Sequence, residues 1–167
     1  MTSPTSRVVA GREIAFPVPV VSASGSGAAF LTRAAVVRRL IAAGPQSAVL
    51  DAGAEPVTLP GGRTPVTIMH VRYHDVPGNV LGAYHEIGLA FQVRVPGAGV
   101  VQHIHELPVD QDFTLAAGNE LWGFPKKLAS PSLKAEIDTP VGTLDYGPVR
   151  VATGTMGYKH RALDPAP

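Results

Sequence analysis

The chain has 167 residues, of which 45% are hydrophobic and 16% charged, and its formal net charge is +1. This length predicts one domain with a substantial core, and so small a net charge gives no electrostatic basis for binding nucleic acid or an anionic membrane. The absence of cysteine excludes disulfides, zinc–thiolate sites and a cysteine nucleophile.

No feature of the sequence predicts secretion or membrane insertion. The N-terminus has no apolar stretch of signal-peptide length, and no window of about 18 residues is apolar without interruption. We therefore expect a cytoplasmic protein without a membrane or nucleic-acid partner.

The N-terminal part of the chain combines irregular segments with one helix. Residues 1–13 are predicted to form a mobile polar tail, residues 14–21 an edge strand that tolerates its prolines, and residues 22–27 a flexible loop. Apolar positions at helical spacing predict a helix over residues 32–43, which the Gly44-Pro45 pair ends. We expect this early helix to be the only one.

From residue 47 onward the pattern changes to β-branched and aromatic runs bounded by Gly and Pro, which predict strands. The predicted strands cover residues 47–52, 66–76, 84–95, 99–107 and 112–118, and residues 135–158 hold two or three more. The 18 glycines and 16 prolines fit many turns between short strands. The predicted fold class is mainly β (α+β), an antiparallel β-barrel or stacked sheets, in a single domain over residues 14–167.

A pair of adjacent lysines, Lys126 and Lys127, follows an apolar run in the segment ELWGFPKKLASP. Such a pair is most often solvated, but neighbours in an extended segment point to opposite faces, so one lysine can enter an apolar pocket while the other does not. A lysine becomes a useful nucleophile near neutral pH when its pKa falls from about 10.4 to roughly 7–8. Desolvation and a nearby cation both favour that change.

Histidines and carboxylates form weaker candidate sites. His103, His105 and Asp110 partly match the first metal motif of cupins, since alternate strand residues share a face. The pairs His74-Asp75 and His85-Glu86 are candidate acid–base groups if they lie near the lysines. For each of them an ordinary polar strand surface is the simpler interpretation, and no metal is predicted.

The lysine segment also carries a family resemblance. GNELWGFPKKLASP resembles the active-site segment of acetoacetate decarboxylases, and residues 74–93 and 138–164 are similar to further segments of that family. The resemblance extends from about Phe30 onward. It implies the family's β fold without its last strands, and a homo-oligomer.

The resemblance also implies roles for single residues. Lys126 is the Schiff-base nucleophile, Lys127 supplies a charge that helps to keep Lys126 neutral, and Glu86 positions substrate or moves protons. The candidate substrate-binding residues are Trp122, Phe124 and Met69. Met69 or His70 stands where the family has a second glutamate, and Asn119 stands where it typically has arginine.

The implied function is a lyase that decarboxylates a β-keto acid such as acetoacetate through a lysine imine, with no cofactor beyond the amine. Two alternatives remain open. One is a Schiff-base aldolase or dehydratase acting on a larger keto acid. The other is a non-catalytic small-molecule binder with the same fold.

Overall fold

The computed structural model describes residues 5–136 and 139–155. Its largest element is a six-stranded sheet with the strand order β3-β5-β6-β7-β8, in which β4 also pairs with β6. The strands are β3 (Ala23–Arg33), β4 (Glu55–Pro56), β5 (Arg63–Tyr73), β6 (Tyr84–Val95), β7 (Gly99–Val109) and β8 (Lys126–Leu128). All pairings are antiparallel except the one between β7 and β8.

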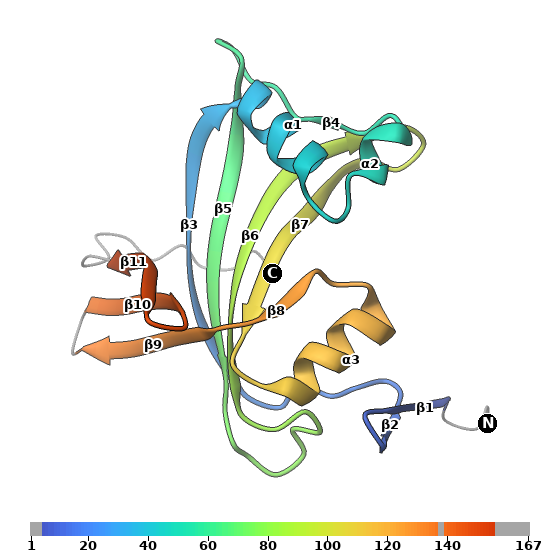
Figure 1. The fold of residues 1–167 in the computed structure, drawn as a ribbon, viewed down its shortest axis with the longest axis vertical. Helices are drawn as coiled ribbons and strands as arrows, with labels where there is room; N and C mark the ends of the chain where they lie inside the picture. Colours follow the sequence, from blue (N-terminus) through green and yellow to red (C-terminus); the bar gives the residue numbers. More distant parts are fainter. Residues whose placement is uncertain (1–4, 137–138, 156–167) are drawn as a thin grey trace, which may run out of the picture.

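A second sheet covers one face of the first, on the left in Figure 1. It has the order β11-β10-β9 and consists of β9 (Ser130–Glu136), β10 (Thr139–Tyr146) and β11 (Val149–Thr155). Strand β9 contacts β5, β6 and β7, and Gly142 of β10 packs against the ring of His70 in β5. The mainly β class with stacked sheets is confirmed, whereas the described strands do not close into a barrel.

The two longer helices pack on opposite faces of the large sheet. The first lies on the face that also meets the second sheet, because Phe91 beneath it and His70 beneath β10 share one face of the paired strands β6 and β5, and the second lies on the face of Glu86. Helix α1 (Ala34–Ala43) buries Val37 and Ile41 against Phe91 and Val93 of β6. Helix α3 (Asp112–Trp122) connects β7 to β8 and packs against both. A short helix, α2 (Ala48–Asp51), follows α1. None of the helices in the described ranges is long and apolar enough to cross a membrane.

The first described residues form a hairpin where the sequence predicted a tail. Strands β1 (Ser6–Val9) and β2 (Arg12–Ala15) pair antiparallel. Val9 and Ile14 are fully buried against Ala117 of α3. Two apolar side chains in an otherwise polar stretch are enough to anchor this hairpin, because α3 offers them an apolar surface.

Four other predicted elements were wrong. Residues 14–21 were predicted as an edge strand, but only Ile14 and Ala15 lie in a strand, β2. Residues 47–52 and 112–118 were predicted as strands but lie in α2 and α3, so the early helix is not the only one. Residues 22–27 were predicted as a loop but most of them begin β3. Strand β3 pairs with β5 along its whole length, including the stretch of serine and glycine at residues 24–27. The hydrogen bonds of this pairing come from the backbone, so they need no particular side chain.

Candidate active site

The end of α3 determines where Lys126 lies. Gly123 adopts the left-handed conformation (φ 65°) and directs its N–H to the carbonyl oxygen of Gly118, as a helix C-terminus requires. Pro125 follows and cannot continue a helix. The chain therefore turns directly into β8, where Lys126 pairs beside Leu107 of β7.

The side chain of Lys126 is buried on the face of the large sheet that α3 covers and meets a carboxylate there. Its Nζ lies 3.1 Å from Oε2 of Glu86 in β6, and the two side chains are only 5% and 11% exposed. The ring centroid of Tyr84 lies 5.1 Å from the same Nζ. The amine thus has one carboxylate partner and an aromatic face beside it, and little contact with water.

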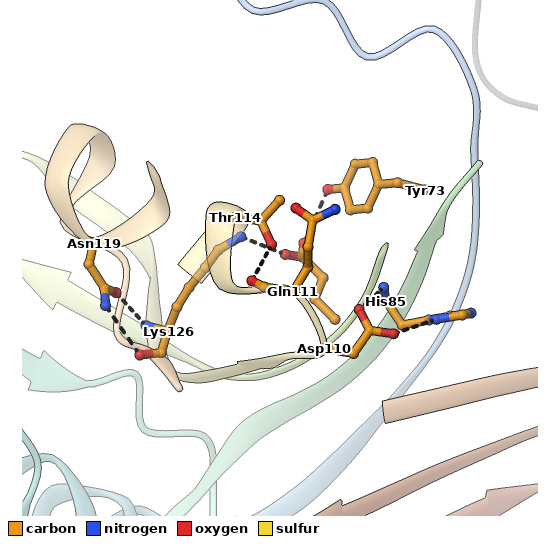
Figure 2. A network of polar contacts seen from close by, with 8 residues as sticks. Tyr73, His85, Asp110, Gln111, Thr114, Asn119 and Lys126 are labelled. Atoms are coloured by element: carbon orange, nitrogen blue, oxygen red, sulfur yellow. Dashed lines mark hydrogen bonds and ion pairs between the residues drawn. The ribbon is translucent and has the colours of Figure 1, made fainter. Parts of the chain in front are cut away.

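The second carboxylate oxygen of Glu86 has a partner of its own. Tyr73 donates a hydrogen bond from its hydroxyl to Oε1, at 3.1 Å, and its ring stacks on that of Tyr84 at a centroid distance of 4.2 Å. Figure 2 shows Tyr73 and Lys126 reaching toward one point from different strands. Burial and the charge of Glu86 raise the pKa of Tyr73 to about 12, and burial likewise raises the pKa of Tyr84.

Helix α3 holds the backbone and the methylene chain of Lys126. Asn119 accepts a hydrogen bond from the Lys126 backbone N–H at 3.0 Å (Figure 2). The methylene groups run directly across Gly118, where an added Cβ would lie 2.5 Å from Cε of Lys126. Only a glycine leaves room for the lysine side chain at this position of the helix.

Lys127 points to the opposite face, as the alternation of an extended strand requires. Its Nζ lies 2.7 Å from Oε1 of Glu106, and its side chain is 48% exposed. The hydrogen bond to Glu106 raises the pKa of Lys127. The two adjacent amines therefore have different surroundings: one is buried and the other is at the surface.

Comparison with known proteins assigns the family. The family model for acetoacetate decarboxylase (ADC) matches residues 11–167. The chain belongs to the acetoacetate decarboxylase family. Over 94 residues it is 55% identical to acetoacetate decarboxylase 1 of Mesorhizobium japonicum, and over 97 residues it is 52% identical to acetoacetate decarboxylase of Acidiphilium cryptum.

These matches cover only part of each relative. They span 56% and 58% of this chain, but 37% and 38% of the two acetoacetate decarboxylases. Among solved structures, acetoacetate decarboxylase of Legionella pneumophila superposes with a TM-score of 0.66 at 34% identity, over 84% of this chain and 49% of that one. An acetoacetate decarboxylase-like enzyme of Sphingomonas wittichii shares the fold, with a TM-score of 0.51 at 16% identity, over 77% of this chain and 53% of that one.

The candidate substrate-binding residues of this family member are not gathered at one place. Met69 lies on the same face of β5 as Tyr73 and packs against Gly88 of β6, two residues from Glu86. Trp122 and Phe124 stack on one another, and Trp122 also meets Phe16 edge-on. They are 39% and 36% exposed. Their described aromatic contacts are thus at the end of α3.

The alternative metal site is not assembled. The rings of His103 and His105 lie 6.2 Å apart, buried beside Phe91, but Asp110 turns away and bonds Nδ1 of His85 at 2.9 Å (Figure 2). Residues 5–136 and 139–155 contain no group of three or more side chains that could hold a metal ion.

A cavity of about 220 Å³ lies between the two sheets, with Phe30, Ile68, His70 and Thr143 in its lining. Its lining includes neither Lys126 nor Glu86, so it is separate from the candidate active site.

Three residues of the site were missed by sequence reasoning: Tyr73, Tyr84 and Gly118. For the tyrosines a signal existed. They stand at the facing ends of two predicted strands, and an antiparallel pairing of these strands places them opposite one another, as observed. Gly118 gave no such signal because its segment was predicted as a strand.

Proposed function

We propose that this protein is a Schiff-base-forming lyase that decarboxylates a β-keto acid such as acetoacetate, with Lys126 as the nucleophile. The supporting observation is the buried amine of Lys126, 3.1 Å from the carboxylate of Glu86. The names of the relatives support the same reaction class. The residues that match the family model include both Lys126 and Glu86.

The reaction follows from amine chemistry. Neutral Lys126 attacks the ketone carbon, and the adduct loses water to give a protonated imine. The bond to the carboxylate carbon breaks, carbon dioxide leaves, and the electron pair moves to the imine nitrogen. The resulting enamine takes up a proton at carbon, and water hydrolyses the imine to free the ketone and the amine. In sum, the keto acid anion and one proton give a ketone and carbon dioxide.

Glu86 is the proton-transfer group in this scheme. It lies within hydrogen-bond reach of Nζ, so it can accept the proton that Lys126 must lose before attack and return it in a later step. The protein interior around the pair strengthens their interaction relative to water. Glu86 therefore acts on the nitrogen of Lys126 rather than on a distant part of the substrate.

A second reaction on the same imine is favoured by one observation. Met69, an apolar side chain, lies on the site face of β5 where the family resemblance implies a second glutamate. An aldol-type condensation or dehydration of a larger keto acid proceeds through the same imine without release of carbon dioxide. Analysis of the products separates the two reactions, because only decarboxylation produces carbon dioxide.

The test is borohydride reduction in the presence of acetoacetate, followed by mass mapping of peptides. We expect a reduced adduct on Lys126 and none in Lys126→Ala. The matched control is Lys134→Ala, which removes an exposed lysine of β9 and should leave the adduct on Lys126 unchanged. A folded wild-type protein without an adduct, or an adduct on Lys127, would contradict the proposal and favour the non-catalytic binder.

A further inference from the structure

The hydrogen bond from Tyr73 to Glu86 has no part in the chemistry described so far. We propose that Tyr73 is a positioning residue that holds Oε1 of Glu86, so that Oε2 stays directed at the amine of Lys126. The inference rests on the proposed function, which gives Glu86 its task. It adds a residue on which the efficiency of proton transfer depends.

The sheet register brings Tyr73 to this place. Tyr73 pairs with Tyr84, and Val71 pairs with Glu86, so Tyr73 and Glu86 are diagonal neighbours on one face of two adjacent strands. A diagonal neighbour is out of reach for a short side chain but within reach of a tyrosine. The hydroxyl therefore arrives at the carboxylate from the side, and leaves the direction toward Lys126 open.

The ring of Tyr73 is fixed by its neighbour. It lies almost parallel to the ring of Tyr84, with an interplanar angle of 13°, and Tyr84 is only 5% exposed. Tyr84 also faces Nζ of Lys126. One stacked aromatic pair thus contacts both members of the Lys126–Glu86 pair, and it defines where the hydroxyl of Tyr73 can lie.

The hydroxyl acts as a permanent donor. Because burial and the charge of Glu86 raise the pKa of Tyr73 to about 12, the phenol keeps its proton throughout the neutral range. An ionised carboxylate accepts on both oxygens, and each oxygen of Glu86 has one donor here. Without the hydroxyl, one buried oxygen would lose its partner and the carboxylate could rotate away from Lys126.

The test compares Tyr73→Phe with Tyr146→Phe. The first change removes the hydroxyl and keeps the stacked ring. The second removes a buried hydroxyl that has no hydrogen-bond partner among the described residues, in the second sheet. For Tyr73→Phe we expect kcat with acetoacetate to fall by about tenfold to a hundredfold, part of what general acid–base catalysis contributes, with KM nearly unchanged. For Tyr146→Phe we expect kcat to stay unchanged.

A second measurement works without any substrate. The carboxyl ¹³C resonance of Glu86, assigned with Glu86→Gln, should move in Tyr73→Phe at neutral pH and stay in place in Tyr146→Phe. An unmoved resonance, an unchanged kcat, or equal effects of the two variants would overturn the inference. If the wild-type protein forms no imine at all, the proposed function fails, and the resonance still decides whether Tyr73 positions Glu86.

Discussion

Lys126 and Lys127 share a peptide bond but lie in opposite environments. The first is buried beside Glu86, and the second reaches the surface and pairs with Glu106. The sequence led us to expect that the charge of Lys127 helps to keep Lys126 neutral. The structure gives that charge a carboxylate of its own on the far side of β8. The charge of Lys127 is thus already paired and faces away from Lys126.

Substitution of Lys127 by alanine should accordingly leave the pH–rate profile in place. The change removes an exposed ion pair, so we expect the free energy of unfolding to change by less than about 1 kcal/mol. The measurement is kcat/KM for acetoacetate as a function of pH in Lys127→Ala and in the wild type. A profile displaced to higher pH would show that the charge of Lys127 acts on Lys126 after all.

At this scale the sequence predicted the pair of Lys126 and Glu86 but not its surroundings. Lys126 and Glu86 were each singled out from one continuous sequence motif. The structure places Nζ of Lys126 3.1 Å from Oε2 of Glu86. Tyr73 could not be found in this way, because its role depends on the register between two strands. A register is a property of two segments, whereas a motif is a property of one.

Helix α3 shows why an element was predicted wrongly. Its buried residues are Thr114, Ala117 and Gly118, which follow helical spacing but are small or polar. Because large apolar residues do not recur at helical spacing in this segment, the sequence shows no apolar helix face. The apolar content of residues 112–118 then favours a strand. The face is made of small residues because it lies against the buried lysine and the N-terminal hairpin rather than against large core side chains.

The helix position most sensitive to size is Gly118. In Gly118→Ala the new methyl group would occupy the space of the Lys126 methylenes, so we expect the amine to move away from Glu86 and turnover to fall by at least about tenfold. Alanine in a helix interior is favoured over glycine by up to about 1 kcal/mol, so stability should fall much less than activity. Activity and chemical denaturation of the same preparation provide the measurement.

Gly154→Ala serves as the matched control, since a Cβ at this position of β11 meets no described atom within 4 Å. It should leave turnover unchanged. Full activity in Gly118→Ala would show that Lys126 can take another path past α3 and still reach Glu86.

At the scale of the whole molecule, two stacked sheets bury a set of histidines. His70 lies between the sheets with both ring nitrogens lacking a described partner, and His103 and His105 lie under α1. The sequence predicted that these segments are strands, since alternation and β-branched residues mark them well. It did not predict which of the two faces would meet the second sheet, because both faces of β5 carry apolar residues: Val66 and Ile68 on one, Met69 and Val71 on the other.

These histidines make stability dependent on pH. Burial, with a smaller contribution from nearby His85, lowers the pKa of His70 to about 4, against the opposing effect of Asp110. Burial also lowers the pKa values of His103 and His105. The unfolded chain therefore binds more protons than the folded one between about pH 6.5 and pH 4. Stability is complete above this window and falls as the pH decreases through it.

The protonation of His70 alone should lower the free energy of unfolding by up to about 3 kcal/mol at the acid end of this pH window. The measurement is the free energy of unfolding by urea at several pH values, in the wild type and in His70→Gln. We expect a shallower dependence in the variant, because its side chain at position 70 takes up no proton. An identical dependence in both proteins would show that His70 is hydrated or paired at acid pH.

Only two residues, Phe124 and Pro125, connect the glycine that ends α3 to the strand that presents Lys126. Successive side chains of a strand alternate between faces, so removing or inserting a single residue here would exchange the two amines: Lys127 would meet Glu86, and Lys126 would meet the solvent. The two amines are chemically identical. The protein distinguishes them by the number of residues in the connection between α3 and β8.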